Sequence, residues 1–372
     1  MKIIGRMLPA LIVGLLLAGS AAYADDIKIG MSGPTSGAEA VFGNTWMNGA
    51  DLAVSEVNKA GGVGGRKVVL VRQDDQGDPK QGTLVAQRFC DDDGMLAVVG
   101  HFNSGVTIPA SDVYNRCGMP EVTNSSNPKV TAAGYKNLFR PIANDYMQGG
   151  IPADYAVKVL KAKSAAIVQD KQAFGQGVAD VFKDEFTKRG GKVTSYSGVA
   201  ATDVDFSALI TKLKSENPDV VYYGGTMPAV ALFLKQMRSL GMKATFFAAD
   251  PAFLPDFITV TGPGGAGSIV SFQAPPYDST PALRNFATGY QAAWHDVPGP
   301  YSAYGYNEMK IILEAMARAK PLNRETIVAE LHKTKSKALT GMIEFTDNGE
   351  LKEPAVFLYK VTNDKFALEY PK

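Results

Sequence analysis

The segments IKIGM at residues 27–31 and KVVLVRQD at residues 67–74 are short, apolar and rich in β-branched residues, as strands are. Between them, residues 43–60 show the amphipathic spacing of a helix. Gly61 and Gly62 end this helix, because glycine readily adopts the left-handed conformation found after helices. A strand, a helix and a second strand in this order form the unit of parallel sheets, so the stretch predicts an α/β protein.

The alternation of strands and helices continues along the chain and restarts once, after Arg140-Pro141. The expected strands of the first set are residues 27–31, 67–74, 96–99 and 121–123, and those of the second set are 165–169, 192–196, 220–223, 245–248, 268–271 and 355–361. Amphipathic segments of helical length separate most of them. Two such sets predict two doubly wound parallel sheets, each in a domain of its own.

The N-terminus has the pattern of an export signal. Lys2 and Arg6 precede an apolar run at residues 8–19, and AYA at residues 22–24 is a small-x-small cleavage pattern. A membrane-spanning helix needs about 20 apolar residues, which is longer than this run. We therefore expect residues 1–24 to be a signal peptide and Asp25 to begin a mature protein in the periplasm.

Charge and length narrow the function classes. Loss of Lys2 and Arg6 with the leader would change the formal net charge from +1 to −1, and no block of like charge occurs elsewhere. This balance gives no electrostatic support for a nucleic-acid or membrane-surface partner. The length favours two domains of ordinary size, and a monomer is the default expectation.

The cysteines and histidines predict neither a metal nor a cofactor. His101, His295 and His332 lack the spacing of metal ligands, and Cys90 and Cys117 alone cannot make a structural zinc site. Both cysteines lie at ends of helices that lead into neighbouring strands, and an oxidising compartment favours a disulfide between them. Two buried free thiols are the alternative.

Polar loops follow several expected strands, at the edge where parallel sheets bind ligands. VVGHFNSG at residues 98–105 leads into a helix start at Ser104, where a hydroxyl and free N–H groups can bind a carboxylate. TNSSNP at residues 123–128 offers similar groups after the next strand, and Asp250 is a carboxylate suited to an ammonium group. Helix capping and turn formation are the alternative roles of these residues.

Catalytic and metal chemistry have weaker support. His101 lies three residues from Ser104, but this spacing is not that of a known nucleophile and base, and no orienting acid is evident. Asp74, Asp75 and Asp78 follow a strand and could suggest magnesium, but their sequence context is that of a turn and a solvated helix start.

Several short strings occur in order along nearly the whole chain after the leader. They are IGMSGP at 29–34, NKAGGV at 58–63, DD at 74–75, DPKQ at 78–81, GH at 100–101, PASD at 109–112, DKQ at 170–172, FG at 174–175, DFS at 205–207 and VYYGG at 221–225. With these strings the chain resembles the type I periplasmic solute-binding proteins of the leucine/isoleucine/valine class, which feed ABC importers.

This resemblance implies a Venus-flytrap fold of two doubly wound lobes joined by three crossovers. The crossovers are expected near Asn144, Pro275 and Pro354. The first lobe would comprise residues 25–143 and 276–353, and the second lobe residues 144–275 and 354–372.

The resemblance also implies a ligand site in the cleft between the lobes. In the first lobe, Ser104, Ser125 and Asn127 match positions that hold the ligand carboxylate in the family, although Asn127 falls at a one-residue gap. In the second lobe, Asp250 matches the acidic group that holds the ligand ammonium. Closure of the lobes would bring the two groups of contacts together.

The expected pocket walls are Phe42, Phe174 and Tyr301. Thr226 stands where the branched-chain proteins carry an aromatic hydroxyl, and Asp250 stands where they carry the longer glutamate. Both changes leave more room beside the ammonium. A branched-chain amino acid is the first expectation, and a larger amino acid, an amide or an aromatic acid are the alternatives.

The predicted function is therefore reception of a small amino-acid-like solute for an ABC permease at the inner membrane, with no chemistry on the ligand. A sensory receptor with the same fold is an alternative that the sequence does not separate. An exported hydrolase that uses Ser104 and His101 is a remote one.

Overall fold

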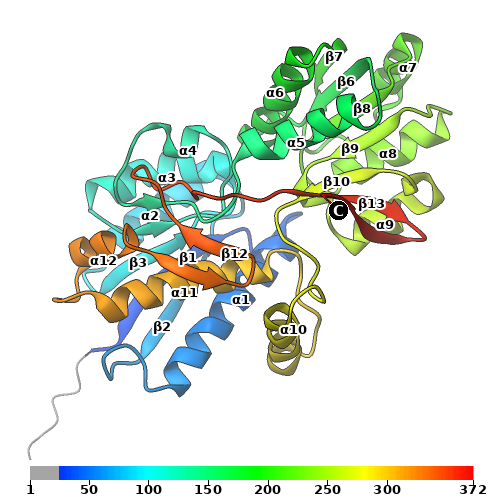
Figure 1. The fold of residues 1–372 in the computed structure, drawn as a ribbon. Coiled ribbons are helices and arrows are strands. Elements are labelled where there is room, and N and C mark those ends of the chain that lie inside the picture. Colours follow the sequence, from blue (N-terminus) through cyan, green and yellow to red (C-terminus); the bar gives the residue numbers. More distant parts are fainter. Residues whose placement is uncertain (1–24, 372) are drawn as a thin grey trace, which may run out of the picture.

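The computed structural model describes residues 25–371, so the expected signal peptide at residues 1–24 lies outside the described residues. The chain forms two α/β lobes, each built around its own sheet (Figure 1). This confirms the predicted fold class.

The first lobe contains a parallel sheet with the strand order β2-β1-β3-β4-β5. Its strands are β1 (Ile27–Gly33), β2 (Val68–Asp74), β3 (Met95–Gly100), β4 (Glu121–Val122) and β5 (Leu138–Phe139). The helices that follow these strands are α1 (Ala40–Lys59), α2 (Pro79–Asp91), α3 (Ser104–Arg116) and α4 (Lys129–Ala132).

A later part of the chain returns to the first lobe. It contributes α10 (Pro281–Trp294), α11 (Ser302–Arg318), α12 (Arg324–Leu331) and the hairpin of β11 (Lys335–Ala338) with β12 (Gly341–Glu344). Glycines let α11 approach α1 closely. A Cβ atom added to Gly49 would lie 1.9 Å from the carbonyl oxygen of Ser302, and one added to Gly305 would lie 2.0 Å from that of Trp46. This contact holds the start of α11 at the cleft.

The second lobe contains a sheet of seven strands with the order β14-β13-β10-β9-β8-β6-β7. The parallel strands are β6 (Ser164–Gln169), β7 (Lys192–Gly198), β8 (Val220–Gly224), β9 (Thr245–Ala248) and β10 (Ile269–Phe272). The α-helices are α5 (Asp145–Lys158), α6 (Ala173–Lys188), α7 (Ser207–Glu216), α8 (Ala229–Ser239) and α9 (Pro255–Thr261), and two short 3-10 helices are η1 (Asp250–Ala252) and η2 (Gly262–Gly265).

One edge of this second sheet differs from the wholly parallel prediction. β13 (Phe357–Thr362) and β14 (Lys365–Tyr370) pair antiparallel with β10 and with each other. The tail reaches the sheet from the first lobe without a crossover helix. Asn363 and Asp364 then form a two-residue hairpin connection with φ values of +51° and +54°, the conformation that tight hairpin turns require.

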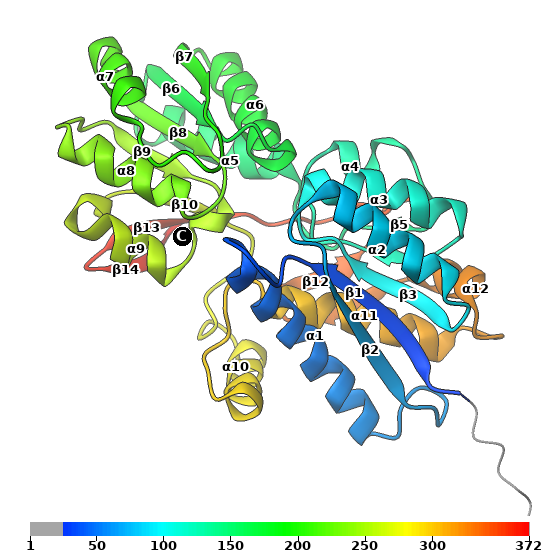
Figure 2. The same cartoon turned by 180° about the vertical axis from the view of Figure 1, so that it is seen from behind.

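The chain passes between the two lobes three times, as Figure 2 shows from behind. The connecting segments are residues 140–144, 273–280 and 345–356. The precise lobe boundaries given above stay predictions.

Cys90 and Cys117 are joined by a disulfide, with their Cα atoms 5.9 Å apart. They lie at the C-terminal ends of α2 and α3, which pack side by side in the first lobe. Arg324 of α12 covers this end of the lobe and donates hydrogen bonds to the carbonyl oxygens of Met95, at 2.9 Å, and Asp92, at 3.0 Å.

Among residues 25–371, no helix has both the length and the apolar character required to cross a bilayer.

Candidate functional site

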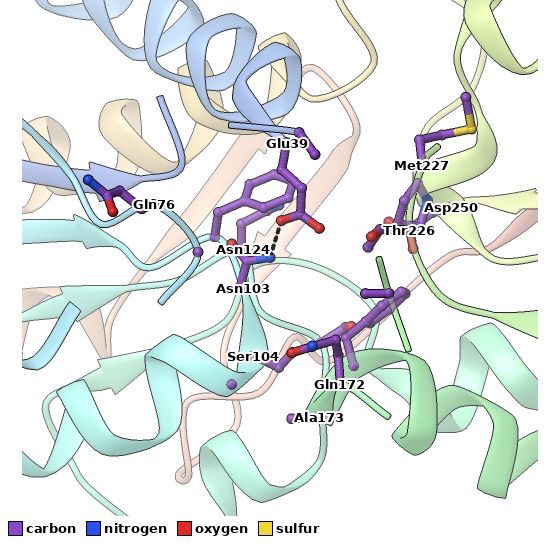
Figure 3. Close-up of a pocket in the computed structure, with 18 of the residues that line it drawn as sticks. Glu39, Gln76, Asn103, Ser104, Asn124, Gln172, Ala173, Thr226, Met227 and Asp250 are labelled. Atoms are coloured by element: carbon purple, nitrogen blue, oxygen red, sulfur yellow. Dashed lines mark hydrogen bonds between the residues drawn. The ribbon is translucent and has the colours of Figure 1, made fainter. Parts of the chain in front are cut away.

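A cavity of about 250 Å³ lies between the lobes, at the carboxyl ends of strands from both sheets. The first lobe contributes loops after β1, β2, β3 and β4, and the second lobe contributes loops after β6, β7, β8 and β9. Figure 3 shows polar side chains converging on this space from both sides. Its position is the one at which open parallel sheets bind ligands.

Ser104 begins α3 and lines the cavity. Its hydroxyl oxygen accepts a hydrogen bond of 3.2 Å from the backbone N–H of Asn127, which links two neighbouring loops. The second lobe brings another helix start to the same cavity, where Ala173 and Phe174 begin α6. The first N–H groups of a helix have no partner within it, so two helix starts favour a negatively charged ligand group between them.

The loop after β4 lines the cavity with residues other than those predicted. Asn124 and Ser126 face the cavity, whereas Ser125 does not line it. The Ser125 hydroxyl lies 2.5 Å from Thr107 Oγ1 and 3.1 Å from the Phe102 carbonyl oxygen, beneath the surface. The reason is that successive side chains of an extended segment point to opposite sides.

Asn127 also does not line the cavity. Its side chain lies at the contact between the lobes, where Nδ2 donates a hydrogen bond of 2.6 Å to the carbonyl oxygen of Ala173. Its Oδ1 accepts a bond from the backbone N–H of Lys129. In this position Asn127 joins the lobes.

Asp250 follows β9 and lies on the second-lobe side of the cavity, with a relative exposure of 5%. Oδ2 accepts a hydrogen bond of 2.8 Å from the hydroxyl of Tyr301, which belongs to the first lobe. Oδ1 is buried and accepts no hydrogen bond of normal length and angle among residues 25–371. Burial raises the pKa of Asp250 to about 7, although the Tyr301 bond and the nearby Gln273 side chain oppose the shift. A cationic ligand group would stabilise the charged carboxylate.

The aromatic wall differs from the prediction at one position. Phe174 and Tyr301 line the cavity, but Phe42 does not. Phe42 is buried behind the wall, stacked on Phe102 at 5.9 Å between ring centroids and edge-on to Tyr301 at 5.6 Å. Phe102 takes its place at the surface of the cavity, because the first turn of α1 directs Phe42 into the core of the lobe.

Thr226 lines the cavity next to Met227, on the loop after β8. Beneath this loop, Asp170 is buried after β6, and burial raises its pKa to about 6. The second-lobe side of the cavity is therefore acidic.

His101 belongs to the core of the first lobe. Its Nδ1 lies 2.6 Å from Asp75 Oδ2, and its Nε2 lies 3.2 Å from the hydroxyl of Tyr114. Both ring nitrogens therefore have partners other than Ser104. Asp78 caps α2 by accepting bonds from two backbone N–H groups, as its turn context predicted. In the part of the chain that the structure describes, no group of three or more potential ligands is placed to hold a metal.

One cavity residue, Glu39, had no signal in the sequence. Glu39 precedes α1, and one of its carboxylate oxygens accepts a hydrogen bond of 2.6 Å from Nδ2 of Asn103 (Figure 3). Asn103 belongs to the loop at residues 98–105, which the sequence predicts to bind ligand, but Glu39 lies 64 positions before Asn103. Only the fold brings them together.

Comparisons with known proteins agree with this geometry. A family model described as periplasmic binding protein matches residues 26–365. The Leu/Ile/Val-binding protein homolog 1 of Brucella melitensis is 36% identical over 352 residues, covering 94% of each chain. An amino acid binding protein of Pseudomonas aeruginosa is 34% identical over 366 residues, covering 96% of each chain.

A solved structure has the same architecture. The crystal structure of the leucine binding protein LivK of Thermotoga maritima superposes with a TM-score of 0.86 at 30% identity, covering 92% of this chain and 97% of the other. A family match over nearly the whole chain, relatives above 30% identity and a shared two-lobe fold all point to one family. The chain belongs to the periplasmic binding proteins.

Proposed function

We propose that this protein binds a free amino acid between its lobes and delivers it unchanged to an ABC importer. One observation carries the proposal. Asp250 offers a buried carboxylate oxygen without a partner among the described residues, on the opposite lobe from the helix start at Ser104. An amino acid carries a carboxylate, which suits the helix start, and an ammonium group, which suits the Asp250 carboxylate.

The two ends have to act together because burying a zwitterion is costly. Removing a carboxylate and an ammonium group from water is unfavourable unless each meets an opposite charge or several hydrogen bonds. The starts of α3 and α6 and the hydroxyls of Ser104 and Ser126 would receive the carboxylate. Oδ1 of Asp250 would receive the ammonium group.

Contacts between the lobes support a mechanism of closure around the ligand. The bonds from Asn127 to Ala173 and from Tyr301 to Asp250 both join one lobe to the other. A ligand between the lobes would add contacts to each side. It would therefore favour the closed arrangement over an open one.

The names of the relatives support an amino acid as the ligand, and the Brucella melitensis relative is named for leucine, isoleucine and valine. The wider proposal includes export with cleavage after Ala24, a free monomer in the periplasm and a permease partner.

The test is Asp250→Asn, which keeps the shape of the side chain and removes its charge. Calorimetry with a panel of the twenty amino acids should identify ligands of the wild-type protein. We expect the variant to lose about a hundredfold in affinity for them, the size of loss typical when one partner of a buried charge pair is removed. Asp256→Asn is the matched control, because Asp256 is exposed on α9 of the same lobe.

Two results would contradict the proposal. In the first, no amino acid binds the wild-type protein. In the second, Asp250→Asn binds the same amino acids as tightly as Asp256→Asn does. The melting temperature without ligand, measured for each variant, separates loss of binding from loss of fold.

A further inference from the structure

We infer that the amino acid bound here has a side chain that ends in N–H donors, and that a cationic side chain is preferred over an aliphatic one. This inference rests on the proposed function and concerns the part of the cavity beyond the carboxylate and ammonium sites. The pair of Glu39 and Asn103 defines that part (Figure 3).

Glu39 and Asn103 are the residues before α1 and α3, and neither side chain caps its helix. An asparagine at such a position usually accepts a hydrogen bond from the first turn of the helix. Here Nδ2 of Asn103 instead donates to Glu39, and both side chains line the cavity. The side chains at two helix-capping positions therefore line the cleft instead of capping their helices.

The bond between them fixes which atoms remain for a ligand. A carboxylate only accepts hydrogen bonds, so the NH₂ group of Asn103 has to face Glu39. Oδ1 of Asn103 then points away, and it is buried with no partner among the described residues. The second oxygen of the Glu39 carboxylate is also an acceptor. The two free oxygens of the pair are therefore acceptors, and one N–H of Asn103 remains beside them.

The other buried side-chain polar atoms of the cavity that lack a partner have the same character. Among the cavity residues that the structure describes, the buried side-chain atoms without partners are Oδ1 of Asn103, Asn124 and Asp250. All three are oxygen acceptors. Asn124 has a relative exposure of only 6%, so solvent does not readily replace the missing donor. A buried acceptor left unpaired is unfavourable, and a ligand rich in donors would remove this cost.

The charges of the residues that line the cavity also indicate a ligand with a cationic side chain. Glu39 and Asp250 lie on opposite lobes, and no lysine, arginine or histidine lines the cavity in the part of the chain that the structure describes. The ammonium group of any amino acid compensates one carboxylate, that of Asp250. Glu39 remains uncompensated beside an aliphatic side chain but is paired by a lysine, ornithine or arginine side chain.

The shape of the cavity allows this side chain to reach the pair. Phe102 and Tyr301 form a wall next to Asn103, against which the methylene groups of a long side chain can pack. Gly77 leaves space beside the pair: a Cβ atom there would lie 3.5 Å from Asn103 Oδ1 and 3.6 Å from Glu39 Oε2. The absence of a side chain at Gly77 therefore leaves Oδ1 of Asn103 and the Glu39 carboxylate open to a ligand group on this side.

The experiment compares lysine, ornithine, arginine, glutamine and leucine by calorimetry on the wild-type protein, Glu39→Gln and Glu39→Leu. We expect the wild type to bind at least one cationic amino acid about tenfold or more tightly than leucine. Glu39→Gln should lose about tenfold in affinity for that ligand and change little for leucine. Glu39→Leu should reverse the preference. Glu325→Gln, an exposed residue of α12, is the matched control.

The outcomes separate the two proposals. If leucine binds more tightly than the cationic amino acids and Glu39→Gln leaves the ratio unchanged, the inference is wrong, while loss of leucine binding in Asp250→Asn would still support the proposed function. If no amino acid binds the wild type, both are wrong. Unfolding temperatures without ligand check that the Glu39 variants fold.

Discussion

The hydroxyl of Tyr301 donates a hydrogen bond of 2.8 Å to Oδ2 of Asp250 across the cleft. Tyr301 lies directly before α11 in the first lobe, and Asp250 begins the short helix after β9 in the second lobe. The bond leaves Oδ1 as the free oxygen of the carboxylate. The residue proposed to hold the ammonium group is thus also part of the contact between the lobes, so ligand binding and closure share one side chain.

Tyr301→Phe should weaken both closure and binding. The variant removes the hydroxyl and leaves Oδ2 of Asp250 without this donor, at a cost of about 1 kcal/mol or more in the closed arrangement. Small-angle scattering without ligand should show a larger radius of gyration, and calorimetry should show about fivefold or greater loss of affinity.

Tyr304→Phe is the matched control for this prediction. Tyr304 is equally buried, and its hydroxyl has no hydrogen-bond partner in residues 25–371. Equal scattering profiles and equal affinities for the two variants would contradict a role of the Tyr301 hydroxyl in closure.

Binding should strengthen as the pH rises from 6 to 8. Burial raises the pKa of Asp250 to about 7 in the absence of ligand, so the carboxylate is mostly protonated at pH 6 and mostly ionised at pH 8. Only the ionised form attracts the ammonium group, which stays charged throughout this range. Affinity measured by calorimetry should increase roughly tenfold between the two pH values.

The Asp250→Asn variant should bind weakly and with little dependence on pH. The same slope in this variant would assign the titration to another acid. Asp145 and Asp170 are the neighbouring candidates, because burial raises their pKa values to about 7 and about 6. Tyr301→Phe provides a further check, since loss of its bond should raise the pKa of Asp250 and move the midpoint to higher pH.

The disulfide should contribute stability without affecting the ligand. Cys90 and Cys117 are separated by 27 positions, and a bridge that closes a loop of this length contributes roughly 3–4 kcal/mol by restricting the unfolded chain. The double variant Cys90→Ser/Cys117→Ser should therefore unfold at lower denaturant concentration. Its affinity for the ligand should match the wild type, because the bridge joins the far ends of α2 and α3, about 20 Å from the helix starts at the cavity. A large loss of affinity in a folded double variant would contradict this separation.

The sequence predicted the lobes well because their signals are local. A run such as residues 67–74 is recognisable as a strand without knowledge of its neighbours, and glycines after α1 mark the end of the helix. The antiparallel edge was missed, although Asn363-Asp364 is a recognisable hairpin signal. The prediction of a sheet that is parallel throughout did not allow for this antiparallel hairpin.

The site was predicted less completely, for two physical reasons. The loop after β4 was identified, but whether Ser125 or Ser126 faces the cavity depends on the register of an extended segment, which composition does not fix. Glu39 reaches Asn103 through the fold alone, so no local pattern marks it. The sequence does place Ser104 and Asp250 at the cavity, because each follows a strand at the edge where ligands bind, and their roles in binding stay predictions.

A buried ion pair near the crossovers should support the loop after β4, which is proposed to help bind the ligand carboxylate. Arg140 has no exposed surface, and its guanidinium donates to the carbonyl oxygens of Asn127 at 2.8 Å and Ser125 at 3.2 Å. The same guanidinium binds the carboxylate of Glu350, which lies on the third connecting segment and also accepts a bond of 3.3 Å from Asn144 on the first. Arg140 therefore joins the loop to two segments that connect the lobes.

Glu350→Ala should destabilise the protein by roughly 3 kcal/mol or more, because it leaves the charge of Arg140 buried without its partner. Glu353→Ala, an exposed change on the same connecting segment, is the control and should have little effect on unfolding. Below its unfolding temperature, Glu350→Ala should also bind its amino acid more weakly, because the loop that carries Ser126 loses its fixed support. An unpaired buried guanidinium cannot be neutralised by losing its proton at ordinary pH, so the cost of leaving Arg140 unpaired cannot be avoided in this way. Coinciding unfolding curves of Glu350→Ala and Glu353→Ala would therefore mean that the pair of Arg140 and Glu350 contributes nothing to stability.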